Sequence, residues 1–163
     1  MTPARLILAL APLTVLGLSA CQQEAQAPVD QNPSAKPGLS ASDGILVLPA
    51  VKGNPAAAYL SLTNRGDTPA ALAGVSIDAA ETAEIHESKD GKMASVDQVD
   101  VAPGATVKFD RGGLHVMAFG LNPDIAPGST VEITLTFTDG DKLSVPLKVE
   151  AVGGATAHDG ADH

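Results

Sequence analysis

The chain contains one cysteine, no tryptophan, one tyrosine and three phenylalanines among its 163 residues. A blue-copper electron-transfer site is excluded, because it needs a cysteine thiolate within the folded domain and Cys21 lies close to the N-terminus. Basic residues are also few, with 10 lysines and arginines against 19 acids and a formal net charge of −9. Such a surface offers no basic patch for phosphates, which argues against a nucleic-acid partner.

The N-terminus reads as a processing signal rather than as part of a fold. Arg5 supplies a positive charge, and residues 6–18 form an apolar run that is too short for an ordinary spanning helix. The run Leu18-Ser19-Ala20-Cys21 resembles the bacterial lipobox, in which the signal is cleaved before a cysteine that is then lipidated. We expect residues 1–20 to be a lipoprotein signal peptide. The alternative is ordinary secretion with Cys21 as a free thiol.

Two segments flanking the centre of the chain contain few large apolar side chains. Residues 21–43 are predicted to be the lipidated Cys21 and a flexible linker, with an r.m.s. reach of about 25 Å. Residues 150–163 are predicted to be a mobile tail that contains histidine and aspartate. We expect a periplasmic monomer held at the inner or outer membrane by its lipid, because an acidic surface does not adsorb to anionic lipid.

The remaining segment, 44–149, has the pattern of a single all-β domain. Residues 131–137 and 143–149 alternate between apolar and polar, and Asp139-Gly140 between them is a hairpin signal. Pro146 predicts an edge position or a bulge in the second of these strands. Shorter strands are predicted at 45–48, 57–63, 71–77, 82–87, 92–99, 106–109 and 113–119. Frequent glycine and proline turns between short strands favour a Greek-key β-sandwich or barrel.

Methionine and histidine are rare, and they gather within this domain. Apart from the start residue, the methionines are Met93 and Met117, and the domain also holds His86 and His115. Two imidazoles and two thioethers form a soft, neutral ligand set that suits Cu(I). Each residue taken alone would more often be an incidental surface histidine or a core methionine. Their occurrence together predicts a copper site.

Strand alternation predicts which of these side chains share a face. His115 and Met117 are two residues apart and should point the same way, whereas Leu114 and Val116 should point into the core. This places Met117 away from the core, beside a histidine.

The other pair lies on either side of a predicted turn. Apolar Ile85 should be buried, which turns His86 outward. A hairpin at Asp90-Gly91 would bring His86 and Met93 close together through local geometry alone. Thioethers also suit an oxidising compartment, because they form no disulfide, although they can be oxidised to the sulfoxide.

These segments resemble the PCuAC family of periplasmic copper chaperones. The spacing Met93-(21 residues)-His115-Val116-Met117 matches the second half of the family's fingerprint, and three further segments resemble family segments: 57–64, 83–87 and 112–117. The chain departs from the family in a shorter spacing between His86 and the next methionine. Ser88 also stands where the family often has methionine.

The resemblance implies a cupredoxin-like β fold that binds one Cu(I) through His86, Met93, His115 and Met117. It also implies transfer of copper to a copper centre of cytochrome c oxidase alongside a Sco-type copper protein. No enzymatic turnover is implied, and the sequence contains no nucleophile elbow, phosphate-binding loop or metalloprotease helix motif.

Two further histidines, His158 and His163, lie in the C-terminal tail beside aspartates. Imidazole with carboxylate suits Cu(II) better than Cu(I), so they are either an auxiliary Cu(II) site or incidental. The principal alternative for the whole chain is a lipid-anchored β-sandwich that serves binding or adhesion and holds no metal.

Overall fold

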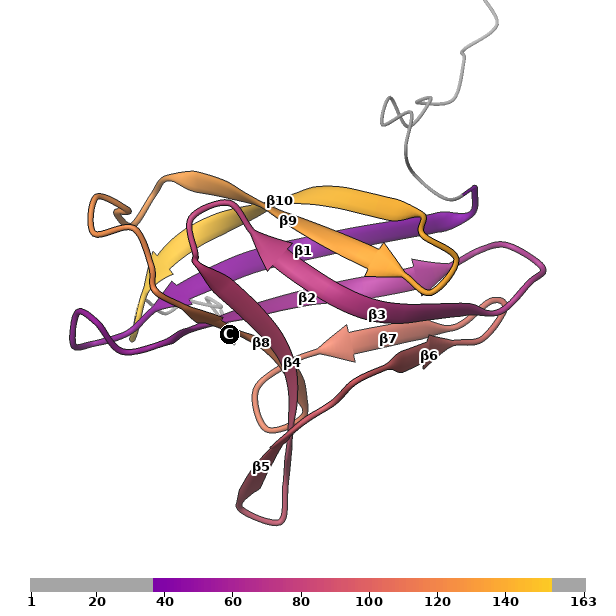
Figure 1. Ribbon diagram of the computed structural model, residues 1–163, viewed down its shortest axis with the longest axis horizontal. Helices are drawn as coiled ribbons and strands as arrows, with labels where there is room; N and C mark the ends of the chain where they lie inside the picture. The colour runs from indigo at the N-terminus through magenta and orange to yellow at the C-terminus, as the bar shows by residue number, and fades with distance from the viewer. Residues whose placement is uncertain (1–36, 154–163) are drawn as a thin grey trace, which may run out of the picture.

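The computed structural model describes residues 37–153 (Figure 1). This part of the chain is built of strands, without any helix. The strands are β1 (Leu39–Leu48), β2 (Ala56–Asn64), β3 (Ala70–Ile77), β4 (Thr82–Lys89), β5 (Lys92–Ser95), β6 (Val99–Val101), β7 (Thr106–Phe109), β8 (Leu114–Phe119), β9 (Thr130–Phe137) and β10 (Lys142–Ala151). Within residues 37–153 no helix is long and apolar enough to cross a membrane. The predictions for the signal peptide, Cys21, His158 and His163 fall outside the described residues.

The strands form one curled sheet in the order β5-β4-β8-β2-β1-β10-β9-β3-β6, and β7 pairs with β2. All pairings are antiparallel except that of β1 with β10, which places the first and last strands side by side. β3 and β4 are not neighbours in this order, yet a short connection joins them and they pack against each other. The sheet therefore folds over on itself, and the β4–β5 hairpin projects from the body (Figure 1).

The core occupies the inside of this curl, because strand alternation sends one set of side chains inward. β2 alternates along its whole length between buried and half-buried residues. The largest fully buried side chains come from seven strands: Leu46, Leu62, Leu72, Val101, Val116, Ile133, Leu135, Phe137, Leu147 and Val149. The core is thus aliphatic with little aromatic content, as the composition requires.

The folded domain begins before residue 44, where the sequence predicts its start. β1 starts at Leu39, which is buried and pairs with Asn64 of β2. Residues 40–42 are small or polar, but they pair with β2 through backbone hydrogen bonds that do not depend on apolar side chains. The predicted linker is therefore shorter at its C-terminal end, and β10 likewise extends two residues beyond 149 to Ala151.

The predicted strand 92–99 is two strands in the structure. β5 pairs with β4, and β6 pairs with β3 at the other edge of the sheet. The connecting residues 96–98 carry the chain between these two partners. The break could not be seen in the sequence, because it depends on which neighbour each half pairs with.

Pro146 lies inside the sheet rather than at its edge, because β10 runs between β1 and β9. Its missing N–H is accommodated by a bulge in the neighbouring strand. The register of β1 shifts between Ser42 and Ile45, and pairing with β10 begins only at Ile45 and Lys148. A Cβ on Gly44 would stand 2.6 Å from the Pro146 carbonyl oxygen, so only glycine fits there. The edge position was a wrong alternative, and the bulge is in β1.

Asn64 is the buried polar residue that closes the end of β2. Its amide Nδ2 donates to the carbonyl oxygens of Thr68 at 2.8 Å and Val101 at 3.0 Å, and its Oδ1 accepts from the Gly66 N–H at 3.0 Å. Asn64 is only 2% exposed, so water cannot readily replace its amide if an apolar side chain is substituted. The Thr68 and Val101 carbonyls and the Gly66 N–H would then each lose this hydrogen bond.

Asn64→Leu is expected to lower the free energy of unfolding by about 3 kcal/mol, because three hydrogen bonds are lost at about 1 kcal/mol each. Urea denaturation followed by circular dichroism measures this. Thr63→Val, which removes only the exposed hydroxyl bonded to Thr106, is the matched control and should cost less than about 1 kcal/mol. Equal stability of the two variants would contradict the assignment of Asn64 as a structural anchor.

Two predicted hairpin turns are present as expected. Asp139-Gly140 lies in the loop that joins β9 to β10. Asp90 and Gly91 have φ of 52° and 73° and join β4 to β5 directly, with Lys89 paired to Lys92. Positive φ at both central residues is the signature of a type I′ turn, which fixes the register of a two-residue hairpin. This turn determines how Met93 stands relative to His86.

Candidate metal centre

The two domain histidines lie directly opposite each other on neighbouring strands. His86 of β4 pairs with His115 of β8, and their ring centroids are 6.1 Å apart with the planes tilted by 47°. The preceding residue of β4, Ile85, pairs with Val116, and both are buried in the core. Because paired residues point to the same side of a sheet, both imidazoles lie on the face turned away from the core.

Met117 joins the histidines on this face. It follows His115 by two residues, is half-buried, and pairs with Glu84 of β4 and Ala57 of β2. It is therefore the diagonal neighbour of His86, at about 7–8 Å between backbone positions, within reach of a long side chain. The predicted orientation of His115 and Met117 is confirmed.

Met93 lies on the same face but on the far side of β4 from His115. It pairs with Ser88, two residues from His86, so it is diagonal to His86 on the other side. Its side chain is 56% exposed on the projecting hairpin. The β4 partners of the two methionines are Ser88 and Glu84, so Met93 and Met117 are about 13 Å apart along the strands. The structure brings His86, His115 and Met117 together and leaves Met93 at the margin.

The ring nitrogens of the two histidines have different surroundings. His115 is 6% exposed, and its Nδ1 is 2.9 Å from the carbonyl oxygen of Gly113. A carbonyl only accepts, so Nδ1 carries a proton and, in the neutral ring, Nε2 keeps its lone pair. In His86 the other ring nitrogen has the partner: Nε2 lies 3.1 Å from the Glu84 carboxylate oxygen Oε2.

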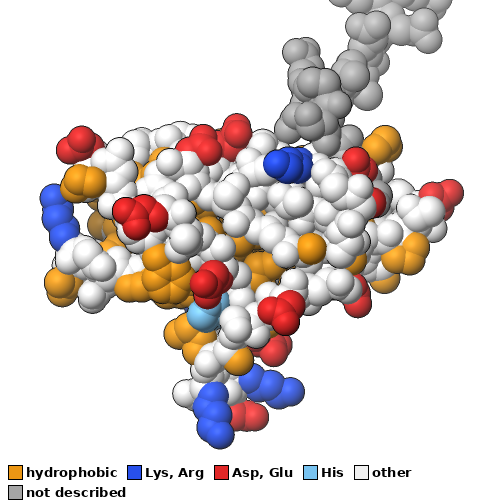
Figure 2. Space-filling view, viewed as in Figure 1, with side chains coloured by type: hydrophobic (Ala, Val, Ile, Leu, Met, Phe, Trp, Pro, Cys, Tyr) orange, Lys and Arg blue, Asp and Glu red, His pale blue; other side chains and the backbone are white. Residues whose placement is uncertain are grey.

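The neighbourhood of His86 contains an aromatic ring and a polar atom in need of a partner. The Phe119 ring centroid lies 6.5 Å from that of His86. The buried Nδ1 of His86 has no hydrogen-bond partner among residues 37–153. A buried nitrogen without a partner is costly unless something else binds it. Figure 2 shows histidine at the surface where the hairpin leaves the body, bordered by hydrophobic and acidic side chains.

Glu84 and Phe119 were not among the residues predicted from the sequence. Each lies two residues from a candidate ligand, Glu84 before His86 and Phe119 after Met117. The same alternation that paired His115 with Met117 therefore indicates that these side chains share the face. Their spacing gave neither residue a metal-binding role, because a carboxylate and a phenyl ring are not soft donors.

The donor set depends on the thioethers. Within residues 37–153, no three or more histidine, cysteine, aspartate or glutamate side chains are grouped so as to hold a metal ion. Two imidazoles without sulfur fall short of the four ligands typical of structural zinc. Imidazole with thioether is a combination suited to Cu(I), and the unpartnered Nδ1 of His86 is consistent with a metal-binding role.

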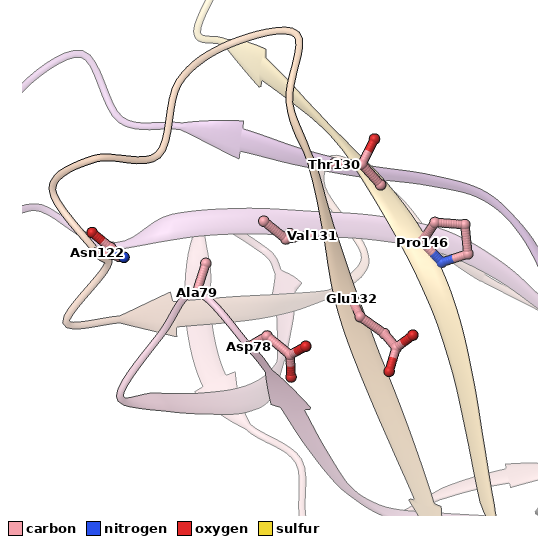
Figure 3. A pocket seen from close by; sticks show the side chains of 7 residues that line it. All are labelled: Asp78, Ala79, Asn122, Thr130, Val131, Glu132 and Pro146. Atoms are coloured by element: carbon pink, nitrogen blue, oxygen red, sulfur yellow. The ribbon is translucent and has the colours of Figure 1, made fainter.

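A separate pocket of about 450 Å³ lies elsewhere in the domain (Figure 3). Its lining residues are Asp78, Ala79, Asn122, Thr130, Val131, Glu132 and Pro146. Two carboxylates face this hollow, but no histidine or methionine does. The pocket therefore lacks soft donors, and the candidate metal centre lies on an open sheet face instead.

Comparison with known proteins agrees with this fold. The chain belongs to the family described as "Putative lipoprotein LpqE-like", whose model matches residues 39–149. It is 28% identical over 150 residues to "Putative lipoprotein Lxx21020" of Leifsonia xyli subsp. xyli, covering 86% of this chain and 87% of that protein.

Solved structures share the architecture. The solution structure of CuI-DR1885 from Deinococcus radiodurans is 30% identical, with a TM-score of 0.56, covering 74% of this chain and 83% of that one. The copper-bound PCuAC domain from PmoF2 is 24% identical, with a TM-score of 0.61, covering 70% and 93%. The predicted resemblance to PCuAC domains and the predicted cupredoxin-like all-β fold are confirmed.

Proposed function

We propose that this protein is an extracytoplasmic, lipid-anchored copper chaperone that binds one Cu(I) and passes it on without catalysing a reaction. The observation that carries the proposal is the pairing of His86 with His115 on the outer face of the sheet, with Met117 beside them. The 30% identity to CuI-DR1885, a protein solved with Cu(I), supports the same conclusion.

The proposed ligands divide into a fixed group and a peripheral one. His86, His115 and Met117 stand on adjacent central strands and supply two nitrogens and one sulfur. Met93 supplies the second sulfur from the exposed hairpin, on the far side of β4 from His115 and Met117. A ligand at the margin is also the one that an acceptor can displace first, which suits a carrier that must release its cargo.

The remaining parts of the proposal concern location and delivery. Membership of a lipoprotein family supports a membrane anchor at Cys21, and thioether ligands suit an oxidising periplasm. We propose a copper centre of cytochrome c oxidase as the recipient and a Sco-type copper protein as a fellow donor. His158 and His163 of the C-terminal tail are proposed as an auxiliary Cu(II) site.

An anaerobic titration against a colorimetric Cu(I) chelator tests the proposal. The full mature chain is expected to retain one Cu(I), because it has one group of soft donors. A variant lacking residues 154–163 separates this site from the tail and should retain the same Cu(I). If the protein retained no copper under reducing conditions, the proposal would be wrong and an adhesion module without metal would be favoured.

A further inference from the structure

The Glu84 carboxylate is placed to control which nitrogen His86 offers to a metal. Glu84 precedes His86 by two residues, so both side chains lie on the outer face of β4. The Glu84 Oε2 is 3.1 Å from His86 Nε2, whereas His86 Nδ1 is buried without a partner in the described part of the chain.

The hydrogen-bond chemistry of this pair fixes the tautomer. An ionised carboxylate can only accept, so the neutral imidazole must place its proton on Nε2 to make this bond. The lone pair then resides on Nδ1, the atom that lacks a partner. A hydrogen bond at one ring nitrogen generally decides which nitrogen binds a metal.

We propose that Glu84 is a positioning residue that commits His86 to bind Cu(I) through Nδ1, while His115 binds through Nε2. This inference rests on the proposed copper function. In His115 the Gly113 carbonyl holds the Nδ1 proton and leaves Nε2 free, which is the opposite arrangement. The site therefore combines one Nδ1 and one Nε2 donor from two directly paired histidines.

Glu84 also supplies a negative charge beside an otherwise neutral ligand set. It pairs across the strands with Met117 and so lies next to two proposed ligands. Imidazole and thioether leave the single charge of Cu(I) unbalanced, and a nearby carboxylate favours the loaded state. Glu87 offers a matched control, because it is also exposed and adjacent to His86 but points to the other face of β4.

The first experiment needs no copper. Nitrogen-15 NMR of the histidine side chains in the metal-free mature protein, at about pH 8 where imidazole is ordinarily neutral, reports the tautomer directly. We expect His86 to be protonated at Nε2 and His115 at Nδ1. In Glu84→Leu the His86 signals should shift while those of His115 stay unchanged. A His86 protonated at Nδ1 in the wild type would overturn the proposal.

The second experiment adds Cu(I). Binding should shift the nitrogen-15 resonances of His86 Nδ1 and His115 Nε2. Glu84→Leu should weaken Cu(I) binding about 10- to 100-fold, the usual effect of losing such a partner, and Glu84→Gln, which keeps an acceptor oxygen, should recover part of it. Glu87→Leu should match the wild type.

The outcomes separate the two proposals. Wild-type affinity in Glu84→Leu, or coordination of His86 through Nε2, would overturn the role of Glu84 and leave the copper function standing. A wild type that binds no Cu(I) would overturn the copper function, and the assigned Nδ1 ligand with it. Circular dichroism of each variant establishes that the fold is retained, which is expected because Glu84 is exposed.

Discussion

Replacement of His86 by alanine is expected to lower Cu(I) affinity by at least about 100-fold while the domain stays folded. Losing a residue that merely supports a ligand costs 10- to 100-fold, so losing the ligand itself should reach or exceed the upper end. The fold should survive because the inward neighbours Ile85 and Val116, which form the core beneath this site, are unchanged.

Ser95→Ala is the matched control for this variant. Ser95 pairs with His86 on the same face and is exposed, but its hydroxyl is not a soft donor. It should bind Cu(I) as the wild type does. Competition titration measures the affinities, and thermal unfolding monitored by circular dichroism confirms the folded state. If His86→Ala bound Cu(I) as tightly as Ser95→Ala, the paired histidines would not be the metal centre.

The sequence predicted the local features of this fold far better than its long-range pairing. Alternation located β9 and β10, and the Asp90-Gly91 turn was foreseen because few residues tolerate positive φ. The parallel pairing of β1 with β10 could not be foreseen, since periodicity within a strand carries no information about its neighbour. The start of β1 was missed because residues 40–42 are small or polar and pair with β2 only through their backbone.

For the candidate site, too, the sequence predicted the local features but not the pairing between strands. The shared face of His115 and Met117 followed from a spacing of two within one strand. The pairing of His86 with His115 across β4 and β8 depends on a register between segments some thirty residues apart, which only the structure gives. The short spacing between His86 and Met93 corresponds to the tight β4–β5 hairpin, which places Met93 opposite Ser88, on the far side of β4 from His115.

Met117 can be tested in a way that separates sulfur chemistry from packing. Leucine has nearly the volume of methionine, and such exchanges usually cost less than about 1.5 kcal/mol of stability. Alanine at a packed core position would instead cost about 2–5 kcal/mol. Met117 is half-buried on the outer face, with the core residues Val116 and Ala118 on either side of it in sequence. A change to leucine therefore removes the thioether and little else.

Met117→Leu is expected to lower Cu(I) affinity by about tenfold or more with the unfolding temperature nearly unchanged, because a thioether is a ligand for Cu(I) and an alkyl group is not. Met93→Leu should cause a smaller loss, since Met93 is 56% exposed and lies on the far side of β4 from His115. Chelator competition and thermal unfolding on both variants give the comparison. A Met117→Leu protein with unchanged affinity but lower stability would make Met117 a packing residue, and a larger loss in Met93→Leu would place the metal nearer the hairpin than the paired histidines.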